Sequence, residues 1–509
     1  MREVDRRTIE LGVPGLILME NAAHRVVEFL VETFPRLAEE RIVVLCGKGN
    51  NGGDGLAIAR QLHIRIHPRS LDVLLAAEPS ELRGDAAENY RMLAAAGCPV
   101  QHQLAPRMQA ATLIVDAILG TGLKGAPGGR ALEWIREINH GFPAAEVVAV
   151  DVPSGLDSDS GRPPGEAVHA RYTVTFTAPK VCHILAPACD FAGKLRVAPI
   201  GSPPDLFEKD SSICLALSEP REFRNLFLPR AADSNKGNYG HVLVVAGGRG
   251  KTGAAAMAGV AALRAGAGLS TVASAQSAIT AIASYSPEIM TEPLPETASG
   301  TIALSAADRA VLGAIAANKN VIAIGPGIGS HPETVQFVQR IVNEFEQPIV
   351  VDADALNAIA NSGFRARGPR VLTPHPGEMS RLAKKTIAEI QADRIAAART
   401  FAREHGVHLV LKGHQSVVAS PDGRVWINPT GSPALATGGT GDVLTGVIAG
   451  LIAQFPERLE AAILAGVYLH GRAGQLGAAK LGEKCLIATD LLQFLPEAMR
   501  EVADLSNAL

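Results

Sequence analysis

Short apolar runs that end in a carboxylate or a glycine-rich turn recur along this chain and limit the folds open to it. In the first half they are residues 41–46, 111–116 and 146–151, and in the second half residues 241–246, 320–324, 348–352, 370–373 and 407–412. Helical patterns separate the runs, for example from Gly55 to Leu62, and apolar strands that alternate with helices are typical of parallel sheets covered by helices. The sequence therefore predicts an α/β protein.

The length of 509 residues exceeds what one ordinary hydrophobic core supports, so we expect two domains. Residues 201–220 contain several prolines and serines and show no sustained period, which places the boundary there. We predict domains over residues 1–205 and 229–500, joined by a linker over residues 206–228. The two halves share no visible repeat, which indicates a fusion of different domains.

Charge and composition exclude several classes of partner. A net charge of −3, a pI near 6.5 and 4% aromatic residues argue against nucleic acid and against an anionic membrane. No Cys-x-x-Cys pair occurs, which argues against a zinc site. The N-terminus lacks the apolar core of a signal peptide, and the apolar run at residues 443–453 is too short to span a bilayer. We therefore expect a cytoplasmic protein.

The segment 437–442, Thr-Gly-Gly-Thr-Gly-Asp, combines a glycine-rich loop with a carboxylate. Its glycines leave backbone N–H groups open to an anion, and the apolar stretch from Val443 predicts a helix whose N-terminus favours phosphate. Asp442 then lies where a carboxylate accepts the proton of a hydroxyl that attacks a phosphoryl group. The alternative is a plain glycine turn in which Asp442 caps the helix.

Three loops of the first half share the same design. Residues 47–55 follow the first strand, Asp116 precedes a glycine-rich loop that contains Lys124, and Asp151 ends the third strand. Carboxylates at the C-terminal ends of parallel strands lie where α/β sheets bind ligands, so the loops predict one site. The alternative is that they are ordinary strand–helix turns, with Asp116 and Ser154 as helix caps.

The second half resembles the ribokinase-like superfamily and, within it, the NAD(P)H-hydrate dehydratases, from residue 235 to about 495. The resemblance is carried by the ordered set of segments 236–248, 252–255, 325–329, 351–357, 372–378, 411–416 and 437–442. It implies a three-layer domain that phosphorylates the C6 hydroxyl of the hydrate, with loss of phosphate restoring the dihydropyridine. Mg²⁺ is implied as a cofactor, and ADP and ATP both stay open as donor because no visible motif reads a γ-phosphate.

The same resemblance implies site residues. Asp442 would be the catalytic base, and Ala254, Gly327, His375 and Asp442 would contact the substrate. The nucleotide would be held by Lys412, Gly413, His414, Gln415, Ser416, Ser432, Pro433, Ala434, Leu435, Ala436, Thr437, Gly438, Gly439, Thr440 and Gly441. A lone histidine such as His375 is more often structural, and Asp352 and Asp354 either position substrate or cap the next helix.

The first half resembles the YjeF N-terminal domain, an NAD(P)H-hydrate epimerase with a Rossmann-like three-layer sandwich. Residues 18–23, 47–55, 116–126 and 151–157 carry the resemblance. It implies a potassium site formed by Asn51, Asp116 and Ser154, and Asp151 as the acid/base at C6. The substrate would be bound by Asn50, Asn51, Gly52, Gly53, Asp54, Gly120, Thr121, Gly122, Leu123, Lys124, Gly125, Ala126 and Asp151.

Together the two resemblances imply a bifunctional nicotinamide nucleotide repair enzyme. It would interconvert R and S NAD(P)H-hydrate (NADHX and NADPHX) and dehydrate the S form with an adenine nucleotide. We also expect a homo-oligomer. The alternative is a ribokinase-like kinase for a small alcohol, such as a vitamin precursor, fused to a non-catalytic scaffold domain.

Overall fold

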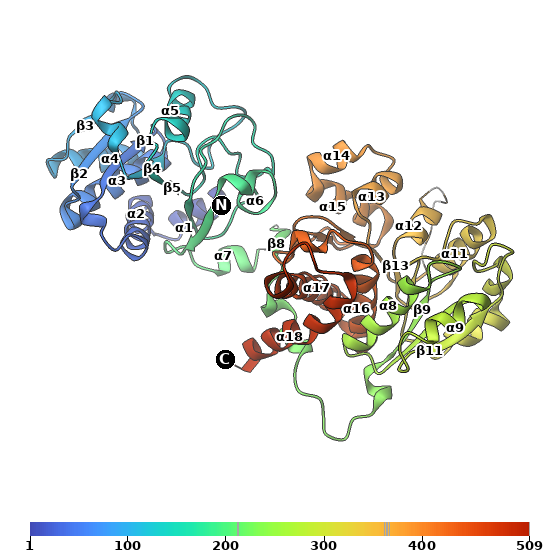
Figure 1. Ribbon diagram of the computed structural model, residues 1–509. Helices are drawn as coiled ribbons and strands as arrows, with labels where there is room; N and C mark the ends of the chain where they lie inside the picture. The colour runs from blue at the N-terminus through green and yellow to red at the C-terminus, as the bar shows by residue number, and fades with distance from the viewer. Residues whose placement is uncertain (211–212, 361, 363–364, 366, 508–509) are drawn as a thin grey trace. The chain divides into compact units, whose positions relative to one another are not determined.

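The computed structural model describes residues 1–210, 213–360, 362, 365 and 367–507. Positions 211 and 212 of the predicted linker, and positions 361, 363, 364 and 366 of the predicted second domain, lie outside the described residues. The chain forms two compact units, Met1–Ile213 and Cys214–Leu509 (Figure 1).

The first unit is built on a parallel sheet in the order β3-β2-β1-β4-β5-β6-β7. Its strands are β1 (Arg41–Cys46), β2 (Ser70–Leu75), β3 (Val100–Gln101), β4 (Leu113–Ala117), β5 (Glu146–Val150), β6 (Tyr172–Phe176) and β7 (Lys194–Ala198). The predicted runs at 41–46, 111–116 and 146–151 are β1, β4 and β5. Because these three strands are neighbours, the loops that follow them meet at one edge of the sheet.

Helices cover both faces of this sheet. They are α1 (Arg2–Glu10), α2 (Gly15–Thr33), α3 (Asn50–Gln61), α4 (Gly84–Ala95), α5 (Gly129–His140), α6 (Val181–Ile184) and α7 (Asp205–Glu208). Alternate residues of β1 enter separate cores: Ile42 packs in the core that includes Leu30 of α2 and Leu56 of α3, and Val43 in the core that includes Trp134 of α5.

The predicted start of α3 at Gly55 is wrong by five positions, because the helix begins at Asn50. Residues 50–55 of the glycine-rich segment are therefore part of the helix itself. A Cβ atom at Gly52 would lie 1.8 Å from the carbonyl oxygen of Gly47, so only glycine fits between this turn and the loop after β1.

The second unit contains a larger sheet in the order β11-β10-β9-β12-β13-β14-β15-β16-β17-β8. Its strands are β8 (Leu215–Leu217), β9 (His241–Val245), β10 (Leu269–Ala275), β11 (Met290–Leu294), β12 (Val321–Ile324), β13 (Ile349–Val351), β14 (Arg370–Leu372), β15 (His408–Leu411), β16 (Val417–Ala419) and β17 (Val425–Ile427). The sheet is parallel from β11 to β15, and β15, β16 and β17 pair antiparallel. All five strands predicted for the second half are present, as β9, β12, β13, β14 and β15, so the α/β class is confirmed in both units.

The unit boundary at Ile213 and Cys214 lies inside the segment predicted as a linker. Beyond it, β8 pairs with β17, and Phe223 is buried in the core of the second unit. Residues 214–226 are therefore part of the second unit.

The helices of the second unit are α8 (Thr252–Arg264), α9 (Ile279–Ala283), α10 (Ala314–Ala316), α11 (Pro332–Glu344), α12 (Asp354–Ile359), α13 (Pro376–Ala383), α14 (Ile387–Ala392), α15 (Arg394–His405), α16 (Thr440–Gln454), α17 (Leu459–Leu481) and α18 (Ala488–Asn507). Helix α16 packs closely on α8, because a Cβ atom at Gly446 would lie 2.1 Å from the carbonyl oxygen of Ala258. Within the described part of the chain, no helix has the length and apolar character needed to cross a membrane.

Candidate functional sites

A cavity of about 760 Å³ opens in the first unit at the edge where β1, β4 and β5 end. Of the residues predicted to bind substrate there, the cavity is lined by Asn50, Asn51, Asp54, Gly120, Thr121, Gly122, Leu123, Lys124 and Asp151. Arg2 and Asp5 of α1 and Lys180 after β6 complete part of the wall and have no counterpart in the sequence prediction. The structure therefore brings the three predicted loops together.

Four further residues predicted to bind substrate lie off the cavity wall. Gly52 packs on the loop after β1. Gly53 packs against Met19, since a Cβ atom at Gly53 would lie 2.7 Å from the Met19 sulfur. Ala126 packs beside Gly165, and Gly125 adjoins it in the chain. These four residues therefore shape the loops, and a molecule in the cavity would contact the residues of the wall instead.

Asp116 and Ser154 form a buried pair between the ends of β4 and β5. The Ser154 hydroxyl donates to Asp116 Oδ1 at 2.5 Å, and the Ser154 N–H donates to Oδ2 at 2.8 Å. Burial raises the pKa of Asp116 to about 6, although the hydrogen bonds from Ser154 act in the opposite direction. Asn51 lies next to Gly120, and its buried side-chain nitrogen has no hydrogen-bond partner among the described residues. The three predicted potassium ligands thus lie together in a buried group that offers oxygen atoms, the ligand type that a hard cation prefers.

Asp151 follows β5 and has a φ of 64°, a left-handed conformation that is uncommon outside glycine. Its Oδ1 accepts hydrogen bonds from Lys180 Nζ at 2.5 Å and from the Thr175 hydroxyl at 3.0 Å. Burial alone would raise the pKa of Asp151, but the charge and hydrogen bond of Lys180 outweigh burial and hold it below its ordinary value. Asp151 is therefore ionised at neutral pH.

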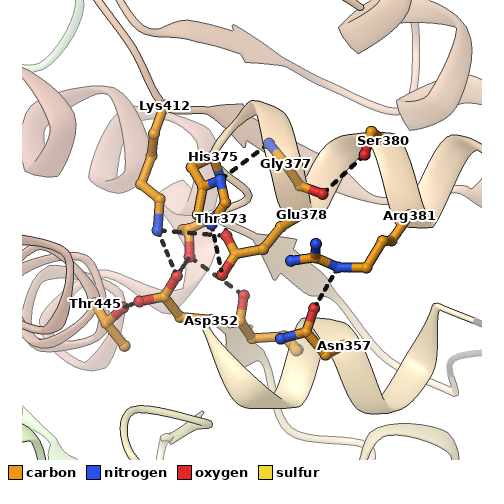
Figure 2. Close-up of polar contacts among 11 residues, drawn as sticks. Asp352, Asn357, Thr373, His375, Gly377, Glu378, Ser380, Arg381, Lys412 and Thr445 are labelled. Atoms are coloured by element: carbon orange, nitrogen blue, oxygen red, sulfur yellow. Dashed lines mark hydrogen bonds and ion pairs between the residues drawn. The ribbon is translucent and has the colours of Figure 1, made fainter. Parts of the chain in front are cut away.

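In the second unit, polar side chains meet at the ends of β13, β14 and β15 (Figure 2). Asp352 is buried there, and its Oδ1 accepts from Lys412 Nζ at 2.7 Å and from the Thr373 hydroxyl at 2.8 Å. Its Oδ2 accepts from the Thr445 hydroxyl of α16 at 2.8 Å. Asp352 thus links three strand ends to the helix that follows the predicted phosphate loop.

Helix α16 begins at Thr440, directly after Gly439 with a φ of 93°. Asp442 therefore lies in the first turn, and the interpretation of Asp442 as the N-cap is wrong. A Cβ atom at Gly441 would lie 3.5 Å from Lys412 Nζ, so the phosphate loop and Lys412 adjoin each other. Burial and the charge of Asp352 raise the pKa of Asp442 to about 6, although Lys412 acts in the opposite direction. A carboxyl with this pKa suits a proton acceptor that works near neutral pH.

His375 and Asp354 each have a structural contact in this site. His375 Nδ1 accepts from the N–H of Gly377 at 3.0 Å and so caps α13 (Figure 2). Asp354 Oδ2 accepts from the N–H of Gly329 at 3.0 Å and lies 3.1 Å from Lys251 Nζ. Neither Asp352 nor Asp354 caps α12, whose N-cap is Ala353 without a side-chain bond, so that alternative is wrong. The half-exposed His375 ring places its Nε2 3.5 Å from Glu378 Oε1.

The predicted substrate residues Ala254 and Gly327 are in contact, since a Cβ atom on Gly327 would lie 3.2 Å from Ala254 Cβ. The predicted nucleotide residues 432–441 form a compact loop, closed by the Thr440 hydroxyl, which donates to the carbonyl of Leu435 at 2.9 Å. Arg394, which the sequence prediction does not include, holds the loop after β15 by donating to the carbonyl of His414 at 2.6 Å.

Replacement of Asp352 with Ala is expected to destabilise the second unit by up to about 3–5 kcal/mol, because the mostly buried Lys412 ammonium loses its carboxylate at 2.7 Å and keeps only the ion pair with Glu378 at 3.9 Å. Each unit contains one tryptophan, Trp134 or Trp426, so a Trp134→Phe background lets Trp426 report urea unfolding of the second unit alone. Asp308→Asn, an exposed control in the same unit, is expected to leave the unfolding midpoint unchanged. An unchanged midpoint for Asp352→Ala would contradict this account of the ion pair.

Comparison with known proteins defines the class to which this pair of α/β units belongs. A family model described as NAD(P)H-hydrate dehydratase matches residues 242–497, and one described as YjeF-related protein N-terminus matches residues 15–182. A bifunctional NAD(P)H-hydrate repair enzyme of Moorella thermoacetica is 43% identical over 99% of this chain and 96% of the relative. The Escherichia coli enzyme of the same description is 36% identical over 91% of this chain and 86% of the relative.

Among solved structures, the ADP/ATP-dependent NAD(P)H-hydrate dehydratase of Bacillus subtilis, co-crystallised with ATP and Mg²⁺, is 34% identical with a TM-score of 0.51. The match covers 56% of this chain and 98% of that protein. Both halves of the chain therefore have relatives in one two-domain repair system. The chain belongs to the family of bifunctional NAD(P)H-hydrate repair enzymes.

Proposed function

We propose that this protein restores NAD(P)H from NAD(P)H-hydrate in two steps, one in each unit. The first unit interconverts the R and S epimers, and the second dehydrates the S epimer with ADP or ATP and releases phosphate. The observation that carries the proposal is that each unit places an ionisable carboxyl group beside the C-terminal ends of its parallel strands, Asp151 after β5 and Asp442 in the first turn of α16 near Asp352. The kinase alternative accounts for only the second unit, whereas the relatives cover both.

In the second unit, the first turn of α16 would bind phosphate with its free N–H groups, and Lys412 would offset negative charge. Asp442 would take the proton from the C6 hydroxyl as that oxygen attacks the terminal phosphorus of the nucleotide. Transfer releases the shortened nucleotide and makes the hydroxyl a phosphate leaving group. Departure of this phosphate from C6, together with loss of a proton from C5, restores the double bond of the dihydropyridine. Mg²⁺ would neutralise the nucleotide phosphates when bound, and the carboxyl oxygens of Glu378, whose charge acts on Lys412, are of the ligand type that it prefers.

In the first unit, the loops at 50–54 and 120–124 would bind the phosphates of the substrate, and Asp151 would move protons at C6. Asn51, Asp116 and Ser154 would hold potassium, which would supply positive charge beside the substrate phosphates. The buried carboxyl of Asp116 and the adjoining hydroxyl of Ser154 support this ligand set.

A direct test is to incubate the protein with a mixture of the hydrate epimers, Mg²⁺ and either ADP or ATP. We expect recovery of the absorbance of NADH, release of inorganic phosphate in equal amount, and consumption of both epimers. A stable phosphoester without recovered NADH would instead show the small-alcohol kinase. Separate incubations with ADP and with ATP identify the phosphoryl donor.

Potassium is expected to raise the thermal midpoint of the first unit above its value in an equal concentration of choline chloride, because a ligand that binds only the folded state stabilises it. For a unit of this size the rise is about 2–4 °C for each kcal/mol of binding energy. Trp134 fluorescence in a Trp426→Phe background reports the first unit alone. Asp116→Asn should abolish the difference between the salts, and a difference that survived this change would place the ion elsewhere.

The homo-oligomer and the cytoplasmic location expected from the sequence stay predictions. Size-exclusion chromatography with light scattering tests the first, and fractionation of cells that express the protein tests the second.

A further inference from the structure

The ammonium group of Lys180 lies in the wall of the first-unit cavity and is almost fully enclosed, with 6% of its side chain exposed. Its Nζ donates to Asp151 Oδ1 at 2.5 Å, to the Thr175 hydroxyl at 2.7 Å and to the carbonyl of Phe176 at 3.1 Å. These three acceptors match the three N–H donors of the ammonium group. A buried lysine with all its donors used inside the protein is held in one position.

The hydrogen bonds to Asp151 all fall on one oxygen. Besides Lys180, Oδ1 accepts from the Thr175 hydroxyl at 3.0 Å and from the N–H of Phe176 at 3.4 Å. Among the described residues these contacts leave Oδ2 as the oxygen available to a molecule in the cavity that Asp151 lines. Asp151 also has a left-handed backbone conformation. Such a strained conformation persists only where the surrounding contacts enforce it, so the backbone of Asp151 is held in place as well as its side chain.

We propose that Lys180 is a positioning residue of the epimerase, which fixes Oδ1 of Asp151 and keeps the carboxylate charged so that Oδ2 acts as the base. The inference rests on the proposed epimerase function of the first unit.

Other ionisable groups near Lys180 do not duplicate this role. Burial and the charges of Asp151 and Asp5 raise the pKa of Asp54 well above its ordinary value, so Asp54 holds its proton more tightly than Asp151. Burial also raises the pKa of Asp5 on α1. On α6, burial lowers the pKa of His183 to about 4 and raises that of Cys182 to about 12. Asp151 is thus the carboxyl group that Lys180 selects for ionisation.

The test uses full-length protein carrying Asp442→Asn, so that one purified epimer converts to the other without being consumed. Lys180→Met is expected to move the acid limb of the pH–rate profile upward by about 1–3 pH units, the effect of losing an opposite charge in contact. Below the shifted limb the epimerisation rate should fall by about tenfold for each pH unit, and it should recover toward pH 8. Lys180→Arg, which restores the charge, should return the limb toward its original position.

Three controls separate this role from a general structural one. Lys194→Met, an exposed lysine on β7, should leave the profile unchanged. His183→Gln should move the limb much less than Lys180→Met, since the charge of His183 is the smallest of the effects that lower the pKa of Asp151. Thr175→Val should move the limb in the same direction as Lys180→Met, by less, since it removes one neutral hydrogen bond to Oδ1.

A Lys180→Met protein whose acid limb stays in place would overturn the inference, whether or not its rate falls. Failure of the parent protein, with Lys180 intact, to interconvert the epimers would instead overturn the proposed epimerase function and this inference with it.

Discussion

Asp442→Asn is expected to abolish recovery of NADH from its hydrate with both ADP and ATP. A positioned general base accelerates a reaction by about 10²–10⁴-fold, so the rate should fall by that factor. The asparagine keeps the shape of the side chain and the start of α16, and nucleotide binding measured by calorimetry should therefore persist. Stopped-time assays of NADH absorbance and phosphate release check the loss of turnover.

The pH dependence of the wild-type dehydratase gives a second readout of Asp442. Its pKa is raised to about 6, and a base works only when ionised, so the rate should fall as the pH drops through about 6. Asp504→Asn, an exposed control on α18, should retain full activity. Full activity in Asp442→Asn would show that the proton goes to another group.

Asp151→Asn is expected to restrict fast repair to one epimer while leaving the dehydration rate of that epimer intact. With mixed epimers, chromatography should show the S form consumed at the wild-type rate and the R form consumed only at the uncatalysed rate of epimerisation. The amide cannot accept the proton at C6, and by the same estimate for acid–base catalysis the enzymic interconversion should slow by about 10²–10⁴-fold.

A control variant and a mixture of two variants test whether the effect of Asp151→Asn is specific to the epimerase step. Asp159→Asn, exposed in the loop after β5, should clear both epimers normally. A mixture of the Asp151→Asn and Asp442→Asn proteins should also clear both, because each contributes one intact unit. Clearance of both epimers at the wild-type rate by Asp151→Asn alone would contradict the role given to this carboxyl.

The strands that carry the sites are predictable because they are buried on both faces. Residues 42–46 and 242–245 are continuous apolar runs, which a central parallel strand requires, and the observed bounds of β1 and β9 lie within one residue of those expected. Strands at the edges lack this pattern. The strand β8 has three half-exposed or exposed residues, and its partner β17 lies about two hundred positions further along the chain, so nothing local marks it.

The two carboxyl groups are visible in the sequence, whereas their partners are not. Asp151 ends an apolar run, but Lys180 reaches it only because β6 pairs beside β5, a neighbour relation that the sheet order alone reveals. Asp352 likewise ends a strand, and its bond to Thr445 depends on how α16 lies on the sheet. Contacts between residues far apart in the chain are therefore the features of these sites that sequence motifs do not predict.

The close contact between α16 and α8 has a consequence for how sequence variants of this protein should be interpreted. Gly446 lies one turn beyond Asp442 and touches Ala258 of α8 instead of a ligand. An added methyl group at Gly446 would push α16 away from α8 and shift the phosphate loop and Asp442 with it. A substitution of Gly446 would then lower the dehydratase activity in the same way as a substitution of Asp442, although Gly446 contacts only another helix.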